Sequence, residues 1–175
     1  NLGGSGATCV VTDTGNAGKV DAVLGQCPGL KVRVLVDGPR EGWIDYATAV
    51  RAASEAFVTV DSAAHDEALC YFTSGTTGHP KMCMHAHSYG LAHRSTGRYW
   101  LDLEPSDLHW NLSDTGWAKA AWSSYFGPWN CGAAIFVHHT QGFSATRTLQ
   151  LLATQPVTTF CGAPTVYRML VQQDL

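Results

Sequence analysis

Short apolar segments alternate with helical patterns along all 175 residues, and this alternation constrains the fold more than any other feature. Runs rich in Val, Ile, Leu and Phe predict strands, whereas the residues between them place apolar side chains at helical spacing. We expect an α/β fold in layers, with a largely parallel sheet and flanking helices. The predicted strands are residues 8–11, 31–36, 57–60, 69–72, 82–84, 108–112, 133–137 and 157–160.

The helices between these strands are predicted from their start and stop residues. Asp45 and Ser144 are suitable N-caps, and Pro28 and Gly127 mark helix ends. Residues 88–100 form a helical pattern in which two glycines each lower helix stability by about 1 kcal/mol relative to Ala. The predicted helices are residues 19–27, 46–53, 88–100, 117–126, 165–174 and the segment from Ser144 to just before Pro156.

Composition limits the kind of protein and its partners. The length is about that of one domain. Charged residues make up only 14% of the chain, which indicates that more protein covers part of its surface. A net charge of -3 gives no basic field for nucleic acid or for an anionic membrane. No apolar run is long enough to span a bilayer, and the first residues do not resemble a signal peptide. The sequence begins without Met, so we expect an internal segment, for which a missing targeting sequence says nothing about the full protein. The cysteine pattern described next is what indicates an intracellular protein.

The six cysteines are scattered and include no C-x-x-C pair. Most of them lie in apolar runs, so we interpret them as reduced, buried residues, with disulfides as the alternative.

A loop of glycines and hydroxyl side chains, closed by a proline and a lysine, lies between the strands predicted at residues 69–72 and 82–84, and the apolar runs of both predict that they are buried. Its glycines allow φ > 0 and lack a Cβ, so backbone N–H groups can converge on an anion. The hydroxyls add donors, and the lysine supplies a positive charge. These residue types predict a phosphate-binding loop, although they also occur in ordinary turns. The loop differs from the Walker A pattern, which needs Gly before the lysine and Ser or Thr after it. Its residues are Thr73, Ser74, Gly75, Thr76, Thr77, Gly78, His79, Pro80 and Lys81.

Two more polar turns follow predicted strands, at residues 113–116 and 162–164. Ligands of parallel α/β sheets bind outside the carboxyl ends of the strands. We therefore expect these turns and the phosphate-binding loop to line one rim.

The loop resembles the phosphate-loop signature of the acyl-adenylate-forming superfamily. Within that superfamily the sequence is most similar to the medium-chain acyl-CoA synthetases, and the resemblance is weakest before Val32. The motifs that carry it are Glu41-Gly42-Trp43-Ile44-Asp45, Tyr71–Gly78, Leu112-Ser113-Asp114-Thr115-Gly116-Trp117, Gly162–Leu170 and Gln172–Leu175.

The resemblance implies a ligase that joins a medium-chain fatty or aromatic carboxylic acid to CoA through an acyl-adenylate, using ATP and Mg²⁺. It implies that residues 73–81 bind the ATP phosphates, with His79 acting through its backbone, and that Lys81 and Thr77 assist catalysis. It also places Trp117, Gly162 and Ala163 in the acyl pocket; core packing is the alternative for Trp117 and turn chemistry the alternative for Gly162. The location implied by the family is the mitochondrial matrix.

Later motifs of the superfamily are not in this sequence, namely those for adenine, magnesium and ribose, the hinge, and the C-terminal domain with its catalytic lysine. We therefore expect residues 1–175 to be one partial domain from the N-terminal region, which needs the remainder of the polypeptide and does not catalyse adenylation alone. The alternative is a truncated, non-catalytic relative that binds a nucleotide or an acyl group.

Two other chemistries were considered. Cys83, His85, His87 and His93 contain zinc-ligand atoms, but their spacing fits no common finger, and we expect ordinary histidines and no metal site. A serine-hydrolase motif is approached at residues 3–7 and fails at Ala7.

Overall fold

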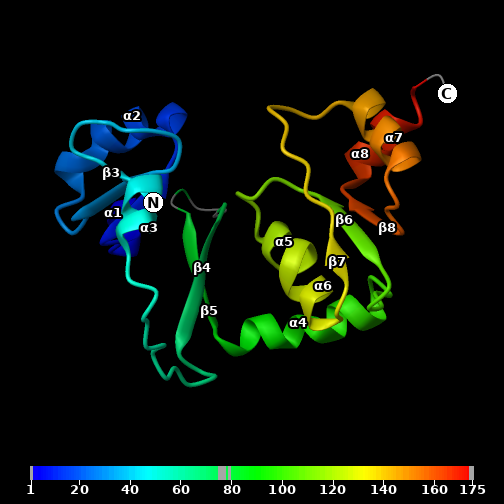
Figure 1. Ribbon diagram of the computed structural model, residues 1–175, viewed down its shortest axis with the longest axis horizontal. Coiled ribbons are helices and arrows are strands. Elements are labelled where there is room, and N and C mark those ends of the chain that lie inside the picture. The colour runs from blue at the N-terminus through cyan, green and yellow to red at the C-terminus, as the bar shows by residue number, and fades with distance from the viewer. Residues whose placement is uncertain (1, 75–77, 79, 174–175) are drawn as a thin grey trace. The chain divides into compact units, whose positions relative to one another are not determined.

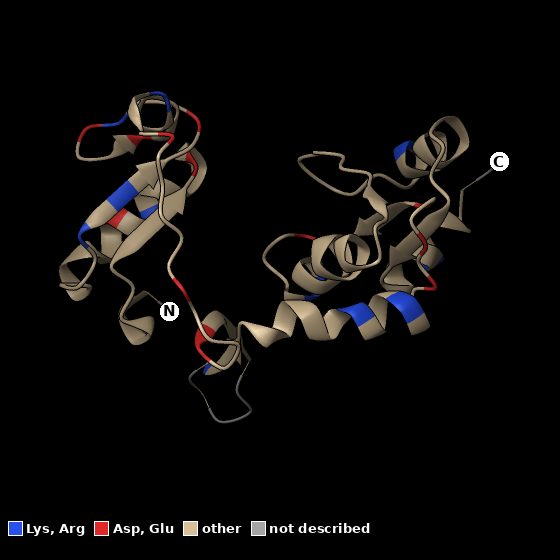
Figure 2. Ribbon diagram, turned by 60° about the horizontal axis from the view of Figure 1, so that its bottom comes forward, with Lys and Arg blue, Asp and Glu red and all other residues tan. Residues whose placement is uncertain are grey.

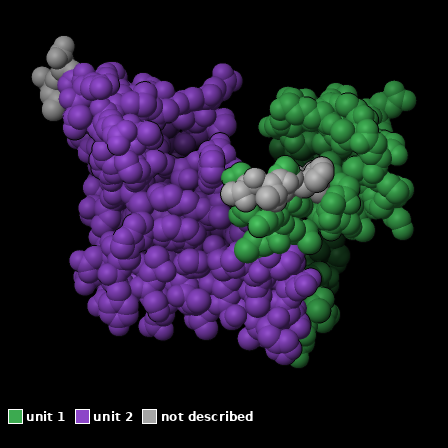
Figure 3. All heavy atoms as spheres, turned by 180° about the vertical axis from the view of Figure 1, so that it is seen from behind, with its two compact units in different colours: residues 1–61, 72–83 green, residues 62–71, 84–175 purple. Residues whose placement is uncertain are grey.

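A computed structural model describes residues 2–74, 78 and 80–173. The chain forms two compact units, which are shown in different colours in Figure 3. Unit 1 comprises Asn1–Asp61 and Phe72–Cys83, and unit 2 comprises Ser62–Tyr71 and Met84–Leu175.

Unit 1 contains a three-stranded parallel sheet. Its strands are β1 (Cys9–Thr12), β2 (Val32–Leu35) and β3 (Ile44–Asp45), with β2 in the middle (Figure 1). The helices are α1 (Leu2–Ser5), α2 (Thr14–Val23), a 3₁₀ turn at Leu24–Gln26, and α3 (Tyr46–Ala52).

The helices of unit 1 begin where side chains cap them. Asp45 accepts a hydrogen bond from the backbone N–H of Thr48 at 2.8 Å, which confirms the predicted cap of α3. Asp13 does the same for the N–H of Asn16, so α2 begins five residues before the predicted start at Lys19. Its buried face contributes Val20 to a small core with Cys27 and Leu30.

Strands β4 (Glu67–Thr73) and β5 (Lys81–Ala86) pair with each other as a separate two-stranded sheet. Only seven residues connect them, too few for a parallel crossover, so they form an antiparallel hairpin. Both strands were predicted, but their predicted burial is wrong: most of their residues are exposed, and Met82 keeps 48% of its surface accessible.

Unit 2 contains a second three-stranded parallel sheet. Strand β6 (Leu108–Leu112) lies between β7 (Ala134–Ile135) and β8 (Thr159–Gly162) (Figure 1). The helices are α4 (Ser88–Tyr99), α5 (Ala118–Ala121), a π-helical turn at Trp122–Phe126, α6 (Gly127–Asn130), α7 (Ala145–Thr154) and α8 (Pro164–Leu170). The α/β prediction is thus confirmed, and its parallel strands are divided between two sheets.

The contact between α4 and α6 uses glycines. A Cβ added at Gly97 would lie 2.7 Å from the carbonyl oxygen of Gly127, so only glycine lets the two backbones come this close. Gly97, one of the two glycines that weaken the sequence-based prediction of α4, is therefore needed for the packing of α4 against α6.

Three predictions of local structure are wrong. Residues 57–60 are not a strand, and Val58 is 91% exposed. Gly127 does not end the helical segment, because the π-helical turn at Trp122–Phe126 continues directly into α6, with Pro128 in the first turn of α6. The strand predicted at residues 133–137 is reduced to the two residues of β7.

The structure contains no disulfide among the six cysteines, all of which lie in the described residues, but the expectation that most are buried is wrong. Cys27 and Cys161 are buried, whereas Cys9, Cys70 and Cys83 are exposed.

Candidate functional site

The loop predicted to bind phosphate joins the two strands of the β4–β5 hairpin. Thr73 ends β4 and Lys81 begins β5, and the Thr73 hydroxyl donates to the carbonyl of Lys81 across 3.5 Å, a long hydrogen bond between the two ends of the loop. Gly78 has φ of +108°, a region that favours glycine. The positive φ expected at Gly78 is therefore present, while Gly75, Thr76, Thr77 and His79 lie outside the described residues.

The charge of the loop is open to solvent. Ser74, Gly78, Pro80 and Lys81 are all exposed. Within the described ranges, the Lys81 ammonium has no acidic side chain within salt-bridge distance. A lysine without an internal counter-ion can offer its whole charge to a phosphate.

The two other predicted turns leave the sheet of unit 2 at the same edge. Leu112 at the end of β6 lies in register with Gly162 at the end of β8, and the strands are parallel. This confirms the shared rim for residues 113–116 and 162–164. Strand β4 belongs to a different sheet, so the phosphate-binding loop does not extend this edge.

The predicted acyl-pocket residues lie at this rim. Trp117 precedes α5 and is 70% exposed, so core packing does not account for it. Gly162 is the last residue of β8, and a Cβ there would lie 3.3 Å from a Val166 methyl carbon, which gives it a packing role as well. Ala163 is the residue before α8, which starts with Pro164.

A polar network that the sequence did not reveal links α5 to the carboxyl ends of β6 and β8. The Lys119 ammonium on α5 donates to the Asn111 side-chain oxygen at 2.9 Å and to the Cys161 sulfur at 3.1 Å. Asn111 in turn donates to the Ser124 hydroxyl at 2.9 Å. The available signal was weak: a single lysine in an otherwise apolar segment next to a predicted pocket residue.

A buried histidine lies on the same strand as Asn111. His109 is almost fully buried, and its Nδ1 lies 2.8 Å from the Thr159 hydroxyl. Burial lowers its pKa, with a smaller contribution of the same sign from the nearby charge of Lys119. The His109 ring is therefore neutral at physiological pH.

Two of the histidines with zinc-ligand atoms, His85 and His93, belong to an aromatic row in unit 2. His85 packs against Tyr89 with 4.5 Å between ring centroids, Tyr89 against His93 at 4.4 Å, and His93 stacks on Trp122 at 5.6 Å. Burial raises the pKa of Tyr89 and lowers that of His93. In the part of the chain that the structure describes, no three metal-ligand residues form a group that could hold an ion.

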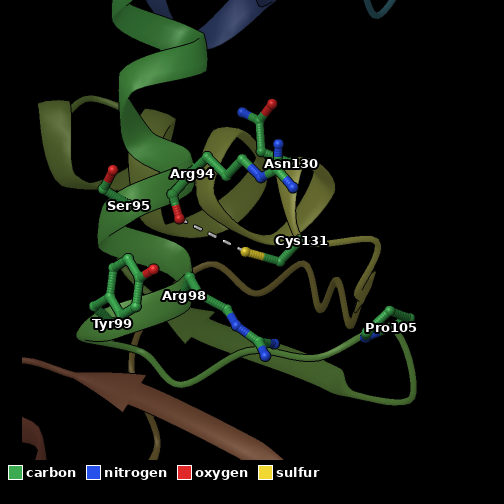
Figure 4. Close-up of a pocket in the computed structure, with 7 residues that line it drawn as sticks. All are labelled: Arg94, Ser95, Arg98, Tyr99, Pro105, Asn130 and Cys131. Atoms are coloured by element: carbon green, nitrogen blue, oxygen red, sulfur yellow. Dashed lines mark hydrogen bonds between the residues drawn. The ribbon is translucent and has the colours of Figure 1, made fainter.

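A hollow of unit 2 lies elsewhere, between α4 and the end of α6. It has a volume of about 460 Å³ and contains two arginines, Arg94 and Arg98, which also form the basic stripe on α4 in Figure 2. Figure 4 shows the Cys131 thiol directed at the backbone carbonyl of Arg94, 3.9 Å away. None of the predicted site residues line it; the lining residues are Arg94, Ser95, Arg98, Tyr99, Pro105, Asn130 and Cys131.

Comparison with known families decides what kind of chain this is. Residues 2–175 match the model of the AMP-binding enzyme family. The chain belongs to that family. The match covers both units and includes the hairpin loop as well as the rim of the second parallel sheet.

Among curated relatives, the chain is similar to mitochondrial acyl-coenzyme A synthetases. The chain is 48% identical to the human mitochondrial acyl-coenzyme A synthetase ACSM3 over 176 residues and 50% identical to its mouse counterpart, and each match covers 99% of this chain. The rat mitochondrial acyl-coenzyme A synthetase ACSM4 is 47% identical. The chain spans about 30% of the length of each of these relatives.

Solved structures give the same result. A Brucella canis acyl-CoA synthetase superposes with a TM-score of 0.83 at 30% identity, over 98% of this chain and 31% of that protein. An anthranilate CoA ligase in complex with anthranoyl-AMP superposes with a TM-score of 0.86 at 25% identity, over 99% of this chain and 35% of that ligase. The predicted kinship with acyl-CoA synthetases is confirmed.

In the part of the chain that the structure describes, no helix is both long and apolar enough to cross a membrane.

Proposed function

We propose that this chain supplies the ATP-phosphate loop and part of the acyl pocket of a medium-chain acyl-CoA synthetase, an acid–thiol ligase. The observation that carries the proposal is the hairpin loop, whose described residues are exposed, with a positive φ at Gly78 and, among the described residues, no acidic partner for Lys81. Its setting supports the proposal, because the chain is 46–50% identical to mitochondrial acyl-coenzyme A synthetases along nearly its whole length.

The reaction has two steps. An oxygen of the acid's carboxylate attacks the α-phosphorus of ATP, and the bond to the bridging oxygen breaks, which gives an acyl-adenylate and pyrophosphate. The CoA sulfur then attacks the acyl carbon, its thiol proton is lost, and AMP leaves with the electron pair of the broken C–O bond. Both products of the first step carry charge that has to be stabilised as the bond breaks.

The loop is suited to the first step. Backbone N–H groups and hydroxyls from Thr73 to Gly78 would hold the phosphate oxygens, and Lys81 would stabilise the negative charge that develops on pyrophosphate. Thr77 is proposed to assist Lys81 as a hydroxyl donor.

Mg²⁺ would arrive with ATP as its phosphate complex. The described residues offer no carboxylate cluster for the ion, and Mg²⁺ in such sites is held largely by substrate phosphates and water. When bound it would neutralise phosphate charge.

The acyl group is proposed to lie against Trp117 and the Gly162–Ala163 segment. The exposed indole of Trp117 offers an apolar wall, and the small side chains of Gly162 and Ala163 leave room beside it. By kinship with the mitochondrial relatives, we propose the mitochondrial matrix as its location, with roles in fatty acid and lipid metabolism.

The chain is proposed to act as a single partial domain of a longer polypeptide, which would supply the rest of the site. The test is thioester formation by the full-length protein with ATP, Mg²⁺, CoA and a series of acids such as butyrate, hexanoate, octanoate and benzoate. Acyl-CoA with equal amounts of AMP and pyrophosphate is expected. Nucleotide binding without any of these products would instead favour a non-catalytic relative.

A further inference from the structure

Lys119 carries a partly buried ammonium group at the carboxyl edge of the β7–β6–β8 sheet. Its two hydrogen-bond acceptors are the side-chain oxygen of Asn111 at 2.9 Å and the sulfur of Cys161 at 3.1 Å. Among the residues with described positions, no carboxylate lies within salt-bridge distance of it. The charge is therefore held in place by neutral groups and has no counter-ion in this part of the chain.

The two acceptors are rigid. Asn111 and Cys161 each expose only 8% of their surface, and the amide of Asn111 is oriented by its hydrogen bond to the Ser124 hydroxyl. An ammonium group has three N–H donors, and these contacts use two of them. The third N–H is preorganised and remains available.

The location favours a ligand for this N–H. Lys119 lies at the end of parallel strands, which is where α/β folds bind ligands. Cys161 directly precedes Gly162 and Ala163, and Trp117 is two residues before Lys119. A partly desolvated cation attracts an anion more strongly than one in open water.

We propose that the third N–H of Lys119 binds an anionic oxygen of a substrate. The proposal rests on the proposed function, which supplies two such oxygens: the carboxylate of the acid and the phosphates of ATP. The neighbourhood of Trp117, Gly162 and Ala163 favours the carboxylate. Lys119 is thereby a substrate-positioning group at the acyl pocket, separate from the Lys81 loop.

Two substitutions in the full-length protein test this. Lys119→Met removes the charge and keeps a long side chain. Asn111→Asp keeps Lys119 and gives it a carboxylate in place of the amide oxygen now 2.9 Å away. Lys31→Met is the control, because Lys31 is an exposed lysine of unit 1. Calorimetric titration with hexanoate and, separately, with MgATP gives each Kd without requiring turnover.

For Lys119→Met we expect the Kd for hexanoate to rise about tenfold to a hundredfold, the usual effect of losing a charge-assisted hydrogen bond. Asn111→Asp should also weaken hexanoate binding, because the new carboxylate neutralises the ammonium, while its melting temperature stays at or above the wild-type value. A purely structural Lys119 predicts the same or higher melting temperature for Asn111→Asp, from the stronger internal ion pair, but no loss of affinity for hexanoate.

The outcomes are separable. A rise in the Kd for MgATP alone assigns the ammonium to phosphate and overturns the preference for the acid. Unchanged Kd values for both ligands in either variant, or no hexanoate binding by the wild-type protein, overturn the Lys119 proposal. Absence of thioester formation by a wild-type protein that binds hexanoate through Lys119 refutes the proposed function alone.

Discussion

Gly97→Ala tests the close contact between α4 and α6. The added methyl group would lie 2.7 Å from the carbonyl oxygen of Gly127, 3.0 Å from its carbonyl carbon and 2.8 Å from the Cys131 sulfur. Two of these three atoms belong to the backbone of α6. The helices therefore have to separate, since no side-chain rotation removes the overlap.

The size of the effect follows from two opposing contributions. Overpacking costs about 1–3 kcal/mol, and the upper end applies because the obstacle is backbone. Replacing Gly by Ala within a helix gains about 1 kcal/mol. We expect a net loss of about 2 kcal/mol in the free energy of unfolding.

Two matched variants separate these contributions. Gly90→Ala lies in the same helix, but its methyl group would meet the Phe126 ring at 3.0 Å, and a ring can shift, so we expect a change near zero. Gly18→Ala in α2 meets nothing within 4 Å and should gain about 1 kcal/mol from helix propensity alone.

Urea unfolding followed by tryptophan fluorescence measures the two α4 variants, and calorimetry measures all three. The expected order of stability is Gly18→Ala, then Gly90→Ala, then Gly97→Ala. A Gly97→Ala protein that is as stable as the wild type, or that gains as much as Gly18→Ala, would refute the close helix contact.

Three further predictions concern the site and its surroundings. Lys81→Ala in the full-length protein should lower kcat/KM for thioester formation by on the order of a hundredfold, measured by AMP release, with Lys31→Ala unchanged; equal rates would refute the role of the loop. Because burial lowers the pKa of His109, the unfolded chain takes up a proton below about pH 6.5 that the folded chain does not. Stability should therefore be fully present above that pH and fall as the pH drops through it; His109→Gln should flatten the dependence of the urea midpoint between pH 8 and 5, and an unaltered slope would contradict this. The 175-residue chain alone should give no exchange between ATP and labelled pyrophosphate, and measurable exchange would show that it holds a complete adenylation site.

Local rules predicted the elements whose ends are set by neighbouring side chains. Asp45 and Ser144 each cap a helix through a hydrogen bond to a backbone N–H three residues later, which depends on short-range sequence alone. The same rule applied to Asp13 would have placed the start of α2 correctly, but the glycines after it favoured a turn. Residues 57–60 have strand composition, yet a strand also needs a pairing partner, which composition does not supply.

The candidate site was predictable only where it consists of consecutive residues. Residue types predict a phosphate-binding loop from Thr73 to Lys81, because phosphate binding needs a continuous stretch of backbone. The Lys119 network was missed because its members come from different segments: Lys119 and Cys161 are 42 residues apart and meet only when β8 lies beside β6. Burial of Met82 was wrongly predicted because apolar character does not say what covers a strand.

The exposed hairpin has a consequence for the proposed binding of ATP. In the part of the chain that the structure describes, its sheet has two strands, so β4 and β5 each keep an outer edge that no third strand of the sheet covers. Pairing of either edge with another strand would fix the positions of Thr73 and Lys81, so that less entropy would be lost when a nucleotide binds as proposed. A partner strand along β4 or β5 would then tighten ATP binding, and ATP would tighten that pairing by the same factor.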